Sequence, residues 1–275
     1  MSKLSRRYSL FKYLALFILA ALFMFPVAWV VLSSFKPQQE LFQVPQTLLP
    51  GRWTFDNYLF SFAQGDFALN IRNSAVVSIS STLLAVLTNT MAGYALSKFI
   101  FPGRDVIFAV MIATLMIPLQ VIMVPIFLQL KGLGMLNTLL GIIIPPAATP
   151  TGIFLARQYM LTLPNSMIEA ARIDGAGEGY LFARIILPLS KPIVATLTIF
   201  SFMWRWNDYL WPLIVITNNR LQTLQQALAG FVGQLQINWS SLLSMTTVSM
   251  IPVVIVFLIF QRYFMIGIAA GSVKG

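Results

Sequence analysis

Six apolar stretches, separated by short polar and charged segments, dominate the pattern of this chain. The first four contain no charged residue over 23 to 25 positions, and about 20 helical residues cross a hydrocarbon core of roughly 30 Å. Between the fifth and sixth stretches, residues 221–241 are rich in glutamine and are expected to form an outside loop or a surface helix. The pattern predicts an all-α polytopic membrane protein with six transmembrane helices. The expected spans are 13–35, 73–97, 106–130, 132–156, 188–210 and 242–261.

The polar groups inside these spans are neutral, and none of the spans carries an ionisable residue near its middle. Ion-coupled transporters and pumps usually place such a residue deep in the bilayer, so any transport is expected to draw its energy from a source outside this chain. Prolines are frequent within the spans, and each permits a kink because it removes a backbone hydrogen bond. They are Pro26, Pro118, Pro125, Pro145, Pro146 and Pro150.

The composition supports the membrane assignment and excludes several kinds of chemistry. Hydrophobic residues make up 58% of the chain and charged residues only 9%, whereas a typical soluble domain is about 25% charged. The sequence has no cysteine and no histidine, which excludes disulfides, thiol nucleophiles and histidine-based triads. It also lacks a glycine-rich loop ending in Gly-Lys-Ser/Thr, so binding of ATP by that route is not expected.

The distribution of basic residues predicts the orientation. With six spans, twelve of the eighteen Lys and Arg residues fall on the side of the two termini, and subtracting the four acidic residues on each side leaves +8 there and +2 opposite. By the positive-inside rule, both termini are cytoplasmic. Arg205 and Asp208 are expected to pair at the outer end of the fifth span. The first span is expected to be a retained helix, with a cleaved signal peptide as the alternative.

The loop between the fourth and fifth spans is the most informative segment. Ser166 and Glu169 have the spacing of a capping box, so a short helix is expected to start near Met167. Glu169 and Arg172 are three residues apart and can pair on that helix. Glycines at 175, 177 and 179 then provide a hinge. Two interpretations remain open at this point: a knob that another protein grips, or an amphipathic linker on lipid headgroups.

The segment 169–192 resembles the "EAA" loop of ABC-importer permeases. Its elements are Glu169-Ala170-Ala171, Asp174-Gly175-Ala176 and, before the fifth span, Ile185, Leu187 and Pro188. The stretches WNDYLWPLIV (206–215) and QRYFMIGIAAGSVKG (261–275) resemble the carbohydrate-uptake subfamily of the maltose and oligosaccharide type, in the smaller of its two permeases. Ser272 departs from the alanine that is usual at this position in the ending.

This resemblance implies the type I ABC importer permease fold and a transport subunit without its own ATPase site. In such a complex the chain pairs with a second permease as a heterodimer, and two ATPase subunits bind ATP and Mg²⁺, so that this chain holds no cofactor or metal. An extracytoplasmic solute-binding protein delivers the sugar, and nucleic acid is not a partner. The resemblance implies that the EAA-loop residues listed above contact the ATPases, with Glu169 foremost, and that Gly271, Lys274 and Gly275 of the tail reach the ATPase interface.

The expected substrate path is built from neutral polar side chains, at Asn89, Gln120, Thr149, Thr151 and Asn207. Helix–helix hydrogen bonding is the simpler alternative for any one of them. Two other functions stay open: a permease for a non-sugar solute, and a membrane scaffold that does not transport. The expected division of the chain in the bacterial inner membrane is a cytoplasmic N-terminus (1–12), the first span (13–35), an extracytoplasmic loop (36–72), a permease core (73–262) that includes the cytoplasmic coupling loop (163–187), and a cytoplasmic tail (263–275).

Overall fold

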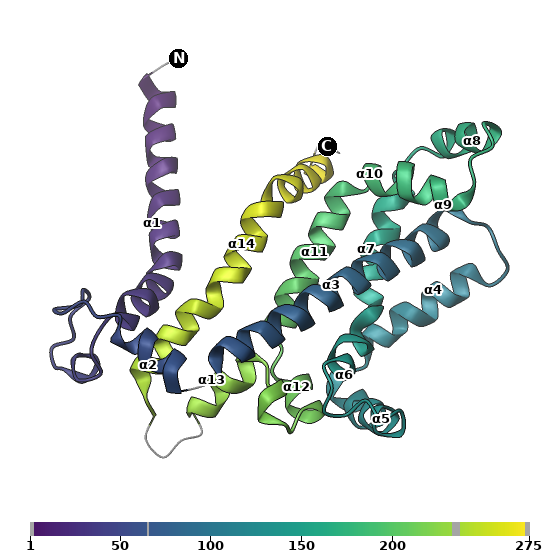
Figure 1. The fold of residues 1–275 in the computed structure, drawn as a ribbon. Helices are drawn as coiled ribbons and strands as arrows, with labels where there is room; N and C mark the ends of the chain where they lie inside the picture. Colours follow the sequence, from purple (N-terminus) through teal and green to yellow (C-terminus); the bar gives the residue numbers. More distant parts are fainter. Residues whose placement is uncertain (1–2, 65, 233–236, 273–275) are drawn as a thin grey trace. The chain divides into compact units, whose positions relative to one another are not determined.

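A computed structural model describes residues 3–64, 66–232 and 237–272 of the chain, with side chains placed except at 3–10, 64 and 264–272. The described residues form helices and no strand, and they divide into a smaller unit (1–67 with 228–251) and a larger one (68–227 with 252–275). Figure 1 shows the elements in order. They are α1 (Lys3–Ser34), η1 (Glu40–Phe42), α2 (Asp56–Gln64), α3 (Phe67–Lys98), α4 (Arg104–Ala113), η2 (Thr114–Met116), α5 (Leu119–Gly132), α6 (Leu140–Ile143), η3 (Pro145–Ala147), α7 (Pro150–Leu161), α8 (Asn165–Ile173), α9 (Glu178–Tyr180), η4 (Leu181–Ile186, a π-helix), α10 (Leu187–Leu189), α11 (Lys191–Trp206), α12 (Leu210–Val215), η5 (Asn219–Leu221), α13 (Leu224–Val232) and α14 (Trp239–Ser272).

Helices α1, α3 and α14 are each long and apolar enough to cross a membrane. Three further spans arise if each pair of helices joined at a sharp bend counts as one, which gives six in the described part of the chain, the number that the sequence predicts. The bent pairs are 104–116 with 119–132, 140–147 with 150–161, and 178–189 with 191–206.

The expected span 106–130 is not one straight helix. The chain bends by 106° between Met116 and Leu119. Pro118 stands at this break with an extended ψ of 140°, and a proline both lacks an N–H and disfavours helix at the residue before it. The fourth span is also displaced from 132–156, because residues 133–139 are not helical and the helical pair runs from Leu140 to Leu161.

In the smaller unit, the segment between α1 and α2 is tied together by polar contacts. The Glu40 carboxylate accepts hydrogen bonds from the backbone N–H of Gly51 at 2.7 Å and from the Thr47 hydroxyl at 3.2 Å. Lys36 Nζ donates to the Thr47 carbonyl. The hydrogen bond from Gly51 lowers the pKa of Glu40 below its ordinary value of 4.5. This part of the expected loop 36–72 is therefore ordered.

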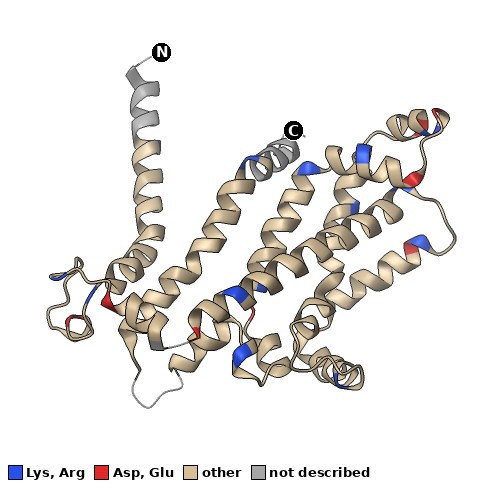
Figure 2. Cartoon of the chain, in the orientation of Figure 1, with Lys and Arg blue, Asp and Glu red and all other residues tan. Residues whose placement is uncertain are grey.

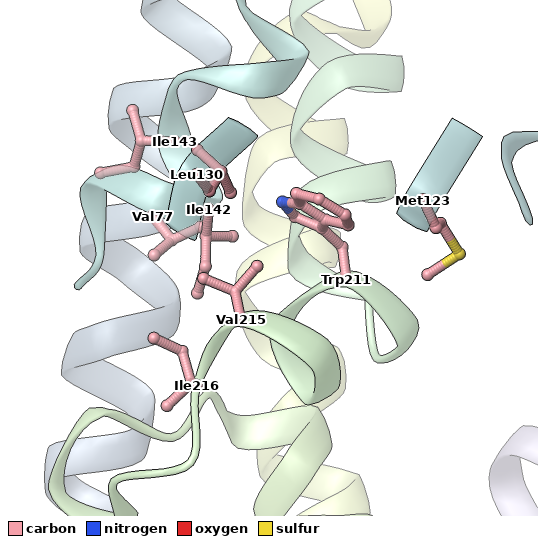
Figure 3. Packing of buried hydrophobic residues seen from close by; sticks show 8 residues of the cluster. All are labelled: Val77, Met123, Leu130, Ile142, Ile143, Trp211, Val215 and Ile216. Atoms are coloured by element: carbon pink, nitrogen blue, oxygen red, sulfur yellow. The ribbon is translucent and has the colours of Figure 1, made fainter. Parts of the chain in front are cut away.

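The larger unit has an apolar cluster that joins α3, α5, α6 and α12 (Figure 3). The indole N–H of Trp211 also donates to the Gly141 carbonyl at 3.2 Å. Next to the cluster, Asn137 adopts a positive φ of 55°, and its side-chain oxygen accepts from the backbone N–H groups of residues 217 and 218. The cluster consists of Val77, Met123, Leu130, Ile142, Ile143, Trp211, Val215 and Ile216.

Helices α3 and α7 approach each other closely through small residues. A Cβ at Gly93 would lie 2.5 Å from the Cβ of Ala156 and 2.9 Å from the backbone nitrogen of Arg157. Small residues allow such close approach in membrane proteins, where packing and polar contacts drive helix association. The contact fixes α7, and with it the start of the loop that follows, against the C-terminal half of α3.

Candidate functional site

The segment between α7 and α11 contains the EAA-type residues, and its first element is α8. Figure 1 shows α8 beyond the end of α7, next to α9. The helix starts at Asn165 with Pro164 as its N-cap and no side-chain capping bond. The predicted capping box is therefore wrong, because the helix starts two residues earlier than Met167 and Ser166 already lies inside its first turn.

Helix α8 rests on the larger unit through one buried side chain and exposes most of the rest. Ile168 is 3% exposed and packs in a cluster with Tyr94, Met160, Leu181 and Ile186. Glu169 and Ala170 are exposed, whereas Ala171 is half-buried against the cluster. The Glu-Ala-Ala triplet thus presents a carboxylate and a small methyl group to the surroundings and uses its last residue for packing.

The Asp-Gly-Ala triplet ends α8 in a Schellman motif. Asp174 is the C-cap, Gly175 follows with φ of 83°, and Ala176 N–H donates to the Ala171 carbonyl at 2.9 Å. The Gly175 N–H donates to the Arg172 carbonyl at 3.0 Å. These two bonds and the left-handed glycine define the motif. The expectation that a Cβ at Gly175 opposes the turn agrees with this φ, whereas the hinge role of the glycines stays a prediction.

The basic residue of α8 pairs with a different glutamate from the one expected. Arg172 contacts Glu178 at 2.8 Å, and in the described part of the chain no ion pair joins it to Glu169. The reversal of the chain after Gly175 brings Glu178 back alongside α8, which spacing along a helix does not predict. Glu169 is left exposed and available to a partner.

Beyond α9 the loop continues as the π-helix η4 and the short α10. Ile186 is fully buried, Ile185 is half-buried, and both lie in the cluster beneath α8. Leu187 is half-buried and Pro188 is exposed at the start of α10. Ile185 and Ile186 therefore anchor the loop, and short π-helical segments occur frequently at functional sites.

The charged residues gather at this end of the larger unit. Figure 2 shows Lys, Arg, Asp and Glu on α8 and α9, whereas most of α3 and α11 is free of charge. Among the described residues no ion pair joins Arg205 and Asp208, the pair expected at the outer end of the fifth span, and Asp208 accepts from the backbone N–H of Trp211 at 3.3 Å. An exposed, charged loop on an apolar helix bundle suits contact with a water-soluble partner.

The candidate substrate-path residues lie in different environments. Asn89 is fully buried, and its amide oxygen accepts from the Thr149 N–H at 2.9 Å while its Nδ2 donates to Thr149 Oγ1 at 3.1 Å. Thr149 also caps α7 through the Gly152 N–H. Gln120 and Asn207 are exposed, and Thr151 is half-buried. The structure brings Asn89 and Thr149 together as a helix–helix contact; the substrate role of the five residues stays a prediction.

Helix α14 continues to Ser272, so the expected tail 263–275 is helical over most of its length. Gly271 lies in this helix, whereas Lys274 and Gly275 are outside the described residues. Sequence reasoning missed Tyr94, Lys98 and Glu178, which hold α8 in place. The four-residue spacing of Tyr94 and Lys98 on α3 was the signal in the sequence that the two side chains could contact the same neighbouring segment, since such residues share a helix face.

Comparison with known proteins provides the family context. The family model "Binding-protein-dependent transport system inner membrane component" matches residues 81–267. The arabinooligosaccharides transport system permease protein AraQ of Bacillus subtilis is 36% identical, over 94% of this chain and 92% of its own length. The diacetylchitobiose uptake system permease protein NgcG of Streptomyces coelicolor is 32% identical, over 98% of this chain and 90% of its own length. The sn-glycerol-3-phosphate transport system permease protein UgpE of Salmonella typhi is 32% identical, over 96% of each chain.

Among solved structures, a chain of a bacterial ABC transporter involved in the import of the acidic polysaccharide alginate superposes with a TM-score of 0.83 at 26% identity. The superposition covers 96% of this chain and 99% of the other. A chain of the bacterial alginate ABC transporter, in complex with an alginate-pentasaccharide-bound periplasmic protein, has the same fold at a TM-score of 0.62 and 15% identity, over 94% and 93% of the two chains.

Proposed function

Because the chain belongs to the family of inner-membrane components of binding-protein-dependent transport systems, we propose that it is the permease subunit of an ABC importer that moves a sugar or oligosaccharide into the cytoplasm. Relatives named for arabinooligosaccharides and diacetylchitobiose cover nearly the whole chain and support a saccharide substrate. The protein is a multi-pass membrane protein and a transport subunit. The relative named for sn-glycerol-3-phosphate keeps a non-sugar solute as the second candidate.

The partners follow from the same proposal. A second permease completes the pathway as a heterodimer, two ATPase subunits bind ATP and Mg²⁺, and this chain has no ATPase site of its own. An extracytoplasmic solute-binding protein delivers the sugar, and a periplasmic protein with bound alginate pentasaccharide in one structural neighbour supports that role. In the proposed topology the chain lies in the bacterial inner membrane with both termini, and α8, in the cytoplasm.

The exposure of α8 is the observation that carries the coupling mechanism. The helix offers the Glu169 carboxylate and a small apolar patch, while Ile168 and the Schellman cap fix its position. In the proposed mechanism, ATP closes the ATPase dimer, α8 moves with the cleft that grips it, and the helix bundle passes from an inward-facing to an outward-facing state. A two-state bundle can be driven in this way only if the partner contacts α8 differently in the two states.

Glu169→Lys tests the coupling role directly. The cognate solute-binding protein is first purified and its ligand identified from a panel that includes arabinooligosaccharides and diacetylchitobiose. The complete complex is then reconstituted, and uptake of that ligand is measured together with ATP hydrolysis. We expect Glu169→Lys and Gly175→Asp to insert normally and to lose at least ten-fold in uptake per ATP hydrolysed.

Gln39→Lys is the matched control, because it adds a positive charge at an exposed position of the smaller unit that has no proposed role. Normal uptake in both loop variants would refute the coupling assignment. A wild-type complex that assembles with ATPase and partner permease but moves no ligand would support the scaffold alternative instead.

A further inference from the structure

The two ends of α8 are attached to the same helix, α3. At its start, Lys98 Nζ donates to the Leu163 carbonyl at 2.7 Å and to Asn165 Oδ1 at 2.8 Å. At its end, Arg172 pairs with Glu178, and the Tyr94 hydroxyl donates to the other oxygen of that carboxylate at 2.9 Å. Tyr94 and Lys98 are four residues apart and share one face of α3. When α8 moves, α3 must therefore either resist the movement or move with it at these two contacts.

The attachment at the end of α8 is a closed ring of contacts. The Arg172 guanidinium donates to one oxygen of Glu178 and lies 5.7 Å from the centre of the Phe99 ring. Phe99 packs edge-on against Tyr94 at 5.3 Å, and Tyr94 returns to Glu178 through its hydroxyl. Tyr94 is 5% exposed, so this hydrogen bond is shielded from water on one side. Charge-assisted hydrogen bonds of this kind are stronger than neutral ones.

The covalent route from α8 to α11 is less direct. After Gly175 the chain passes Gly177 and Gly179, then the π-helix η4, and then an 81° bend before α11. A Cβ at either Gly177 or Gly179 would meet nothing within 4 Å, so open space surrounds this part of the covalent route. The side-chain route through Glu178 bypasses this segment and reaches α3 at once.

Helix α3 is suited to receive the movement. It is 32 residues long and holds the start of α7 through the Asn89–Thr149 hydrogen bonds. Resting on the proposed coupling function, we propose that Glu178 is a transmission residue: with Arg172 and Tyr94 it conveys the movement of α8 to α3, whereas Glu169 meets the ATPase. Glu178 is thus a positioning residue that acts through α3 and does not itself touch the transported sugar.

The absence of cysteine from the chain allows a direct test in the full complex. Single cysteines are introduced by Ile173→Cys on α8, where the native side chain is 86% exposed, or by Val76→Cys near the other end of α3, where it is 39% exposed. Each cysteine receives a nitroxide spin label. Spectra are recorded in lipid with and without ATP–vanadate trapping of the ATPase subunits. In the wild-type background we expect trapping to change the spectra of both labels.

Tyr94→Phe and Glu178→Ala are then combined with each label. We expect the label at 173 to respond as before, because docking is intact, and the label at 76 to show less than half of its normal response. Tyr13→Phe, an exposed tyrosine on α1, is the matched control and keeps both responses. The exchange Arg172→Glu with Glu178→Arg keeps the ion pair, and the guanidinium at 178 can donate to the Tyr94 hydroxyl, which then accepts. We therefore expect the exchange to restore the response at 76, which a loss of packing would not do.

A full response at 76 in Glu178→Ala overturns the proposal, and so does failure of the exchanged pair to restore it. Loss of the response at 173 in the variants would make Glu178 part of the docking surface and would likewise overturn it. If trapping changes neither label in the wild-type background, the proposed coupling function fails, independently of the role of Glu178.

Discussion

At Gly175 the backbone conformation, and not the space around it, limits which residues fit. A Cβ there would meet nothing within 4 Å, yet φ is 83°. The glycines at 175, 177 and 179 were sufficient to predict a helix end at this point. It was not sufficient for the start of α8, because Pro164 and the attachment of Asn165 to Lys98 begin the helix before the apparent capping box.

We expect Gly175→Ala to weaken the cap of α8 by about 1–2 kcal/mol, the approximate cost of placing an L-residue in the left-handed region. Gly177→Ala is the matched control, since Gly177 also has open space around it but has φ of −72°. Hydrogen exchange of residues 165–176 measures the difference. Equal protection in the two variants would contradict the role given to the left-handed turn.

A further residue-scale prediction concerns Glu40, in the segment between α1 and α2 of the smaller unit. Its pKa is lowered chiefly by the hydrogen bond from the Gly51 N–H. A lowered pKa means that the carboxylate stabilises the folded loop fully above the ordinary value of 4.5 and loses this effect as the pH falls through the lowered value. We expect the hydrogen-exchange protection factors of residues 45–55, which are corrected for the intrinsic pH dependence of amide exchange, to fall on acidification in the wild type. In Glu40→Gln these protection factors should already be lower at neutral pH and should change little on acidification, and an unchanged acid response there would exclude Glu40 as the cause.

Among the helices, position along the chain was predictable, whereas direction was not, and α1, α3 and α14 are longer than the expected spans. Apolar runs located α1, α3 and α14 because the bilayer requires about 20 apolar residues in a row. The same rule treated 106–130 as one helix, although the chain turns by 106° near Pro118. The sequence shows that a proline can bend this helix, whereas the angle depends on the neighbours of each half. Here α4 packs on α7 through Phe108 and Phe154, and α5 packs in the cluster that contains Trp211.

Close packing of α3 on α7 leads to an element-scale prediction. Gly93→Ala would force a Cβ to within 2.5 Å of Ala156, so α7 must shift. Overpacking of this kind costs about 1–3 kcal/mol, which exceeds the roughly 1 kcal/mol that alanine gains over glycine in a helix. We expect a lower thermal unfolding midpoint in detergent. Gly132→Ala on α5, which has open space, should leave the midpoint unchanged or raise it, and a matching decrease there would remove packing as the explanation.

For the whole molecule, the charge distribution predicts the side of the membrane on which each loop lies, which no single span can do. The net charges of +8 and +2 assign sides to all the loops at once, because each additional span reverses the side of the next loop. The family match makes a multi-pass membrane protein certain, yet sidedness rests on the Lys and Arg count. The sharp bend after α4 is the critical test, since a hairpin that returned to its own side would invert every later loop.

Because the chain has no cysteine, single cysteines can report the side of each loop. Val44→Cys, Ile100→Cys and Leu133→Cys replace side chains that are 93%, 96% and 71% exposed. With a membrane-impermeant maleimide on intact spheroplasts, we expect labelling at 44 and 133, and labelling at 100 only after permeabilisation. Residue 133 follows α5, so its labelling from outside would mean that the bent pair α4–α5 crosses the membrane once. If 133 were instead labelled only after permeabilisation, with 100, the bent pair would be a re-entrant hairpin, and α8 would lie on the wrong side to meet a cytoplasmic ATPase.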